Sequence, residues 1–492
     1  MRSGELHEFL RQDFIGLDTR YPVVGGRVVR RHYLDSAAST LMMDSAYRVT
    51  QAFLKHYANT HSQLHFSARV ATEVYRWAHR RVLEFVVADP GQYTCFFSGS
   101  GATTGLNRLA RTLAALRPHR DVVLVSAMEH HSNDLPHRKH AGKIEHVPLQ
   151  GEGSALESLD LAALGTLLER NRNRVNYVAV SAASNVTGIT NPLHDIAELA
   201  HAAGAWVVVD ASQLLAHAPV QMTDPADCRR DLDFLVFSGH KAYAPGSPGV
   251  VVARRSLLAP MEPDELGGGM VESVYLDSYH VATDFPDREE AGTPNIIGAL
   301  LLASVLELLG RVGMPRVHMA EQALLKQALR AMSAIPGVLL YGSTDLDRVP
   351  RTGTIAFNVD GLDHGLVAAA LNDYHNIAVR NECFCAHPYV REMLKAQLWM
   401  LDIDPDAPGA SDLIKLKQGM VRASFALYTT PEDVDALLAG IRDVIARQDE
   451  LRALYLPGSG GNYHHCHFAV RSKSLFNPSA ILDDVTGPSV VA

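Results

Sequence analysis

This sequence has few cysteines, a small net charge and no long apolar runs. Five cysteines among 492 residues argue against a disulfide framework and favour a reducing, cytoplasmic compartment. No apolar run approaches the roughly 18 residues that cross a bilayer, and residues 1–14 lack the apolar core of a secretory signal. A net charge of −9 gives no sign of a polyanion-binding surface. We therefore expect a cytoplasmic protein that binds neither membranes nor nucleic acids.

Composition and length indicate a folded protein of more than one domain. Hydrophobic residues make up 47% of the chain and charged residues 20%, which is typical of globular proteins. A single hydrophobic core stops growing at about 250–300 residues. The 492 residues are therefore expected to form two domains with appendages.

Short apolar runs that end in polar residues recur through the first part of the chain. They suit strands buried on both faces of a mainly parallel sheet, joined by helices such as residues 194–203. Because ligands bind at the carboxyl edge of open α/β sheets, the polar residues after these runs mark a candidate site. The runs cover residues 93–97, 122–125, 177–180, 206–209, 234–237 and 249–253.

The pattern changes near residue 296, where helices (297–309 and 318–332) outnumber strands (338–341 and 354–358). This change predicts a large α/β domain followed by a smaller α+β domain. The expected boundaries are an N-terminal arm over 1–30, a large domain over 31–295, a small domain over 296–450, and a flexible tail or lid over 451–492.

Several polar residues at the predicted sheet edge match what pyridoxal 5′-phosphate (PLP) needs from a protein. PLP requires a lysine for a Schiff base, an acid on the pyridine nitrogen, phosphate donors and a group stacked on the ring. Lys241 and Asp210 suit the first two tasks, and Gln213 could donate to the ring hydroxyl. Ser238 and His240 flank the lysine and could bind phosphate, as could the glycine-rich turn 99–103.

Each of these motifs is weak evidence alone, because glycine-rich turns are common and a lone buried Asp or Lys usually caps a helix or forms an ion pair. All of the motifs together, in this order along the chain, are much harder to obtain by chance. With these residues the sequence resembles the class V aminotransferase-fold enzymes, and within them the SufS-like cysteine desulfurase and selenocysteine lyase family. The matching segments are 33–40, 129–133, 184–188, 209–213, 238–241, 290–295, 380–388 and 422–424.

The resemblance implies the PLP-dependent transferase fold type I and a role for each matching residue. Lys241 would carry PLP, His130 would stack on its ring, and Cys385 would accept sulfur. Arg422 would bind the substrate carboxylate, close to Asn185. The remaining cofactor contacts implied are Asp210 and Gln213 on the ring, Ala102, Thr103, Ser238 and His240 on the phosphate, and Thr293 on the phosphate of the neighbouring subunit of a homodimer.

The implied reaction cleaves the C–S or C–Se bond of cysteine or a related amino acid and releases alanine. Sulfur passes to Cys385 as a persulfide, and from there a protein acceptor could take it. The thiolate is the nucleophile, and Arg380 nearby could favour its ionisation. Alternatively, Cys385 is a small apolar filler, as many free cysteines are.

Departures from the family pattern keep other functions open. Glu382, Cys383 and Phe384 replace the usual residues before the loop cysteine, and the Cys-Phe-Cys triplet looks like that of molybdenum-cofactor sulfurases. Either Cys383 or Cys385 could be the working thiol, and an ionised Glu382 close by would raise the pKa of that thiol. One alternative is an aminotransferase, epimerase or C–S β-lyase that does not use Cys385. Another is a binding scaffold without catalytic activity, but the presence of Asp210, Lys241 and Arg422 argues against it.

The cluster of potential metal ligands at residues 463–467 lacks the spacing of a zinc site, so we expect no metal.

Overall fold

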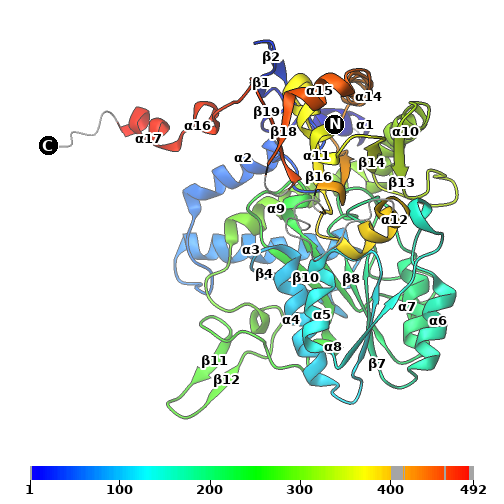
Figure 1. The fold of residues 1–492 in the computed structure, drawn as a ribbon. Helices are drawn as coiled ribbons and strands as arrows, with labels where there is room; N and C mark the ends of the chain where they lie inside the picture. Colours follow the sequence, from blue (N-terminus) through cyan, green and yellow to red (C-terminus); the bar gives the residue numbers. More distant parts are fainter. Residues whose placement is uncertain (1–2, 400–413, 415, 459–460, 487–492) are drawn as a thin grey trace.

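The computed structural model describes residues 3–399, 414, 416–458 and 461–486. Its largest sheet has seven strands in the order β4-β10-β9-β8-β7-β5-β6 (Figure 1). Only β10 runs antiparallel to its neighbours, so the sheet is mainly parallel. The strands are β4 (Tyr93–Ser98), β5 (Val122–Ser126), β6 (Lys143–Val147), β7 (Val175–Ser181), β8 (Trp206–Asp210), β9 (Phe234–Ser238) and β10 (Gly249–Arg254).

Six of these strands coincide with the apolar runs of the sequence. The seventh, β6, was not predicted because it is an edge strand whose residues are mostly exposed or half-buried. An edge strand needs no continuous apolar run, and Lys143, Glu145 and His146 give it a polar composition.

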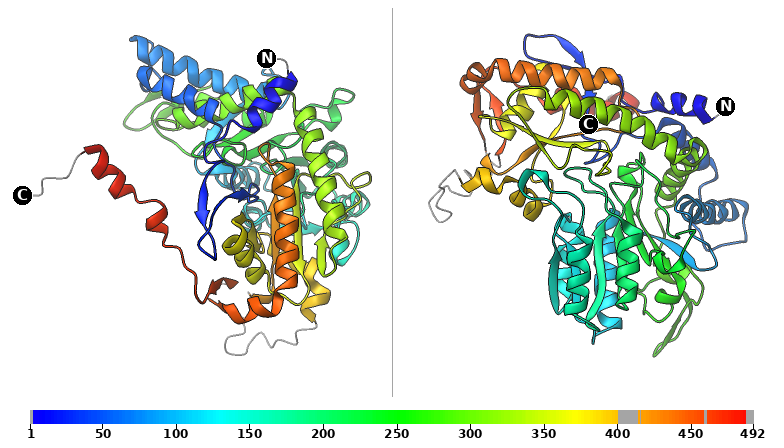
Figure 2. Two further views of the ribbon diagram at one scale, coloured as in Figure 1. Left: turned by 90° about the horizontal axis from the view of Figure 1, so that it is seen from above. Right: turned by 90° about the vertical axis from the view of Figure 1, so that its right-hand side faces the viewer.

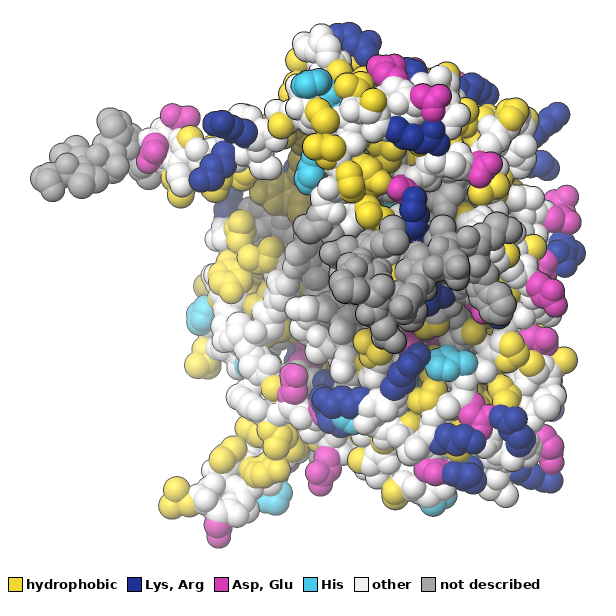
Figure 3. All heavy atoms as spheres, viewed as in Figure 1, with side chains coloured by type: hydrophobic (Ala, Val, Ile, Leu, Met, Phe, Trp, Pro, Cys, Tyr) yellow, Lys and Arg dark blue, Asp and Glu magenta, His cyan; other side chains and the backbone are white. Residues whose placement is uncertain are grey.

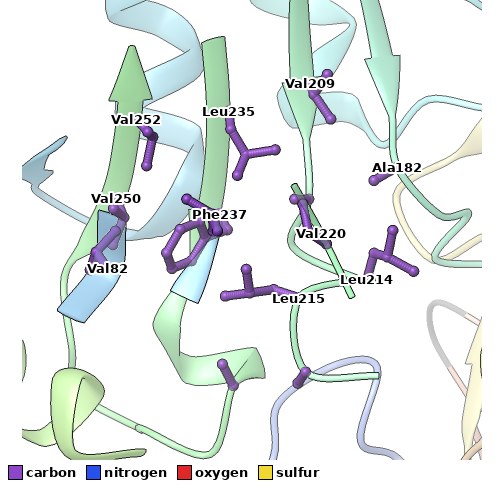
Figure 4. Packing of buried hydrophobic residues seen from close by; sticks show 14 of the residues in the cluster. Val82, Ala182, Val209, Leu214, Leu215, Val220, Leu235, Phe237, Val250 and Val252 are labelled. Carbon is purple, nitrogen blue, oxygen red and sulfur yellow. The ribbon is translucent and has the colours of Figure 1, made fainter. Parts of the chain in front are cut away.

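Helices cover both faces of the sheet, so the residues of each central strand alternate between two cores. Val208 packs in the core beneath α4 (Gly101–Leu116). Val207 and Val209 face the opposite core. Figure 4 shows Val209 in this core with Leu235 of β9 and Val252 of β10. This second core also buries α3 (Phe66–Phe85), α7 (Leu193–Ala202) and α9 (Ile296–Val312).

The smaller domain is an antiparallel sheet of order β13-β14-β17-β16, backed by helices around a separate core. Its boundary differs from the expected residue 296, because α9 packs against α2 (Asp44–Phe53) and α3 in the large-domain core. The small domain begins with α10 (Met314–Ser333). Its other elements are β13 (Val338–Tyr341), β14 (Thr354–Val359), α11 (His364–His375), β16 (Arg380–Glu382), α12 (His387–Trp399), β17 (Met420–Ser424) and α14 (Pro431–Ala446).

The last part of the chain is more ordered than the expected tail. After α15 (Gln448–Leu454), the strands β18 (Tyr455–Pro457) and β19 (Tyr463–His465) form a hairpin against α11. Of the described elements that follow this hairpin, α16 (Ser472–Leu475) and α17 (Pro478–Thr486) extend away from the body (Figure 2). The predicted arm 1–30 contains α1 (Ser3–Arg11), β1 (Arg20–Pro22) and β2 (Val28–Arg30), and the segment after it adds β3 (His32–Tyr33), which pairs with β15 (Ile377–Ala378).

The rest of the large domain consists of short elements. A hairpin of β11 (Val271–Val274) and β12 (Tyr279–Val281) projects from the body (Figure 1). The others are α5 (Leu135–His140), α6 (Leu161–Arg170) and α8 (Arg255–Leu258). Within the described residues, no single helix is long and apolar enough to span a membrane; α9 and α10 together pass that test but are bent by 81°.

Candidate active site

A pocket of about 490 Å³ opens at the carboxyl ends of the parallel strands, beneath β16 and β17. It brings together residues from both domains that are far apart in the sequence. All but one of the predicted site residues line it: Ala102, Thr103, His130, Asn185, Asp210, Gln213, Ser238, His240, Lys241, Arg380, Cys385 and Arg422.

The exception is Thr293, which is exposed and whose hydroxyl accepts a hydrogen bond from Asn59 Nδ2 at 3.2 Å. A larger cavity of about 1100 Å³ lies between α12 and the segment after β6, with a mainly apolar lining that includes Leu149, Leu156 and Tyr389. It contains none of the predicted site residues, and we therefore place the candidate site in the smaller pocket.

One end of the pocket is shaped to receive an anion. The N–H of Ala102, at the start of α4, donates to Ser238 Oγ at 2.7 Å, and this helix end carries a partial positive charge. Gly101 has φ +63°, and a Cβ there would lie 2.8 Å from Ser238 Oγ. A Cβ at Gly249 would lie 2.1 Å from the carbonyl oxygen of Gly101. These positions therefore require glycine, and the glycine-rich turn is more than a generic connection.

The amine and carboxylate of the predicted pair come from neighbouring strands. Asp210 ends β8 and is buried, and its Oδ1 accepts from the N–H of Ser212 at 2.9 Å. Lys241 ends the short turn after β9. Burial lowers the pKa of Lys241, and the charge of Asp210 opposes that effect. Gln213 is held in place by donating from Nε2 to the carbonyl oxygen of Ala37 at 2.8 Å.

His130 is neutral near pH 7. Burial lowers its pKa to about 4, and the charge of Lys241 adds to that shift. Its Nδ1 accepts from the N–H of Ser132 at 3.1 Å, which fixes the ring at the end of its loop. Behind it, the buried carboxylate of Glu129 accepts from Asn133 Nδ2 at 2.6 Å and from the N–H of Ser181 at 2.8 Å.

Two arginines meet at the opposite end of the pocket. Arg380 and Arg422 are register partners on β16 and β17. Asp35 contacts both, with Oδ1 at 3.3 Å from Arg422 Nη2 and Oδ2 at 3.7 Å from Arg380 Nη1. Arg422 also lies over the ring of Phe384, 4.7 Å from its centroid. Asp35 and Phe384 were not among the predicted site residues, because their roles depend on contacts between distant segments.

The two cysteines of the loop after β16 differ in environment. Cys385 is exposed and lines the pocket. Cys383 is buried, its thiol lies 3.3 Å from the carbonyl oxygen of Gln418, and burial raises its pKa to about 11. Glu382 contributes to that shift of the Cys383 pKa and does not line the pocket. Since the thiolate is the reactive form, this geometry favours Cys385 as the working thiol.

Three polar atoms of the pocket residues are buried without a hydrogen-bond partner in the described chain: Asn185 Oδ1, Ser212 Oγ and Arg422 Nε. Buried polar groups are costly unless a partner satisfies them, so these atoms indicate a polar ligand. The pocket could hold a phosphorylated aromatic aldehyde beside an amino acid. It has an anion-binding turn at one end, a carboxylate and an amine at the centre, and an arginine at the far end. No group of three His, Cys, Asp or Glu side chains in the described residues is arranged to hold a metal.

Comparisons with known proteins agree with this geometry. The model of the Aminotransferase class-V family matches residues 32–437. A cysteine desulfurase of Pectobacterium atrosepticum is 33% identical over 419 residues, covering 84% of this chain and 92% of its own length. Another, from Escherichia coli, is 33% identical over 418 residues, covering 84% and 93%.

Solved structures give the same result. The apo cysteine desulfurase of Thermococcus onnurineus superposes with a TM-score of 0.75 at 28% identity, covering 89% of this chain and 98% of its own. The cysteine desulfurase CsdA of Escherichia coli superposes with a TM-score of 0.71 at 29% identity, with the same coverage.

Proposed function

Because this chain belongs to the aminotransferase class-V family, we propose that it is a PLP-dependent cysteine desulfurase that releases alanine and takes up sulfur on Cys385. The observation that carries the proposal is the exposed thiol of Cys385 in the same pocket as Lys241, Asp210 and Arg422. A thiol in that position can reach a substrate held between the amine and the guanidinium.

The cofactor's place follows from the donor set. Lys241 would hold PLP covalently, Asp210 would keep its pyridine nitrogen protonated, and the turn at Gly101, with Ser238 and His240, would hold its phosphate. When bound, PLP supplies an electron sink for the pair left at the substrate α-carbon.

The protein's own groups bind the substrate and move its proton and sulfur. Arg422 binds the substrate carboxylate, since a guanidinium matches a carboxylate in a bidentate pair. Lys241, whose pKa burial lowers, accepts the α-proton as a free amine. The Cys385 thiolate attacks the substrate sulfur, so that an S–S bond forms as the C–S bond breaks and its electron pair stays on carbon. A proton on that carbon completes alanine, and the persulfide remains on Cys385.

The charges around the thiol support this step. Burial lowers the pKa of both Lys241 and Arg422, Arg422 to about 10, and the charge of a Cys385 thiolate opposes the shift in both. Two basic side chains therefore lie close enough to the Cys385 sulfur to interact with a negative charge on it. Because Cys385 is exposed, a protein acceptor could approach the persulfide directly.

A homodimer is part of the proposal. Thr293 is exposed and does not line its own pocket. Large apolar side chains are exposed shortly after Asn59, which contacts Thr293, and between β11 and β12: Leu64 is 92% exposed, Phe66 81% and Leu276 109%. Figure 3 shows hydrophobic side chains gathered over the edge that carries the β11–β12 hairpin. Exposed apolar patches of this kind are typical of interfaces.

Three variants test the proposed function. We expect Lys241→Ala to lose the cofactor's imine absorbance. We expect Cys385→Ser to keep that absorbance and to lose alanine formation from cysteine, and Cys383→Ser, as a matched control, to keep both. Alanine formation by Cys385→Ser at the wild-type rate would show that Cys385 is not the sulfur acceptor. A keto acid in place of alanine would show an aminotransferase, pyruvate a C–S β-lyase, and inversion of the α-carbon an epimerase.

A further inference from the structure

Two histidines join the loop of Cys385 to the loop that carries His130. His131 follows His130 in the large domain, and His387 begins α12 in the small domain. His131 Nε2 lies 3.0 Å from His387 Nδ1, and the two rings are stacked with centroids 4.8 Å apart and planes within 5°. The backbone N–H of His131 donates to the carbonyl oxygen of Cys385 at 2.7 Å. Three contacts therefore connect the loops within three residues of the thiol.

The Cys385 loop needs such support. Glu382, Phe384 and Cys385 have φ values of +88°, +50° and +57°, in the left-handed region that non-glycine residues rarely adopt. Backbone of this kind persists only where its surroundings hold it. Here Asn185 Nδ2 donates to the carbonyl oxygen of Phe384 at 2.6 Å, and His131 holds the next residue.

We propose that His131 and His387 are positioning residues that hold the Cys385 thiol over the pocket, and that the acid-base state of this pair sets how firmly they do so. The inference rests on the proposed function and goes beyond it to regulation of the same site. Two neutral rings, or two rings sharing one proton, can donate and accept across the 3.0 Å contact. Two protonated rings have no acceptor and repel each other.

The surroundings fix the direction of the pH dependence. Burial lowers the pKa of His131, which also faces His387, Asp134 and Arg138. Burial likewise lowers the pKa of His387, which faces Arg391 and Glu382. Because the pKa of both rings is lowered in the fold, both are neutral at about pH 6.5 and above, and the contact is fully formed there. It weakens only when the pH falls past the lowered pKa values of the folded protein and both rings take up protons.

The test compares His387→Ala with His387→Asn, whose amide can replace the polar contact of Nδ1, and uses the exposed His464→Ala as a matched control. In the PLP-loaded enzyme, we expect His387→Ala to lower kcat for alanine formation about 10-fold or more with little change in KM, because a small misplacement of a reacting atom is costly. His387→Asn should recover most of that loss and should no longer show the acid decline of the wild type.

Hydrogen exchange at the His131 amide gives a readout that needs no turnover. We expect exchange there to become faster in His387→Ala, while exchange in β7 (Val175–Ser181) stays slow and so reports an intact fold. Unchanged exchange, or a kcat within about twofold of wild type at every pH, overturns the inference. If the wild type forms no alanine, the proposed function fails by itself, and the exchange measurement still decides whether the two histidines hold the loop.

Discussion

Behind the site, single side chains form a buried polar chain that fixes a proton on one nitrogen of a buried histidine. His137 Nε2 lies 3.0 Å from Asn133 Oδ1, an acceptor, and His137 Nδ1 lies 2.9 Å from the hydroxyl of Tyr177. Asn133 in turn donates to Glu129, next to His130. Nε2 must therefore carry a proton, and in the neutral ring Nδ1 accepts from the Tyr177 hydroxyl, which can both donate and accept.

This arrangement predicts an acid-sensitive stability. Burial lowers the pKa of His137 to about 4 from its ordinary value of 6.5. Above pH 6.5 the folded and unfolded chains are both neutral here. Between pH 6.5 and about 4 only the unfolded chain binds the proton. The free energy of unfolding therefore decreases as the pH is lowered, by about 2 kcal/mol at pH 5 relative to pH 7.

We expect His137→Gln, which cannot titrate, to lose less stability than the wild type between pH 7 and pH 5. Equilibrium urea unfolding at the two pH values measures the difference. Equal losses in the two proteins would show that the proton enters the folded state without cost, contrary to the lowered pKa of the buried His137 ring.

Among the elements, the C-terminal hairpin and the helices after it differ in how they contact the body. Tyr455 OH donates to Asp373 Oδ2 at 3.0 Å, Tyr463 OH donates to Asp363 Oδ2 at 2.6 Å, and Tyr455 is 3% exposed. In contrast, the apolar side chains on and beside α16 and α17 are exposed, Phe476 by 68%, Leu482 by 61% and Val485 by 78%.

We expect a chain ending at residue 470 to unfold within about 1 °C of the full-length protein. A chain ending at residue 454 loses the buried Tyr455 and its hydrogen bonds, which contribute about 3 kcal/mol or more. Its unfolding midpoint should fall by about 3 °C, since the unfolding entropy of a chain of this length gives roughly 1 °C per kcal/mol. Differential scanning calorimetry compares the three chains, and equal midpoints for all of them would mean that the hairpin adds no stability.

The central strands could be predicted from the sequence because burial on both faces leaves a continuous apolar run. The domain boundary could not be predicted from the sequence, since α9 is apolar on nearly every side and its composition does not say which core encloses it. The choice between Cys383 and Cys385 as the working thiol could not be predicted either. It depends on left-handed backbone at Phe384 and Cys385, which no composition predicts.

At the scale of the whole molecule, the pocket is made by two domains and, in the proposed dimer, by two subunits. Asp210 ends a strand of the large sheet and Lys241 ends the turn after the next strand, while Arg422 comes from the small sheet. Asp35, which contacts Arg422, comes from the segment between the N-terminal arm and α2. Thr293 does not line the pocket of its own chain, so in the proposed dimer it would contact the phosphate bound in the other subunit. A defect at Thr293 should then appear in the partner's site.

Mixed dimers test this arrangement. Thr293→Asp places a negative charge against the proposed phosphate, so dimers of this variant should be inactive, as should dimers of Lys241→Ala. A dimer with one subunit of each variant has one site with both Lys241 and an intact Thr293 from its partner. Purified through two different tags, such dimers should therefore recover about half of the wild-type activity per dimer. If Thr293 instead served its own subunit, both sites of the mixed dimer would carry a defect and no activity would return.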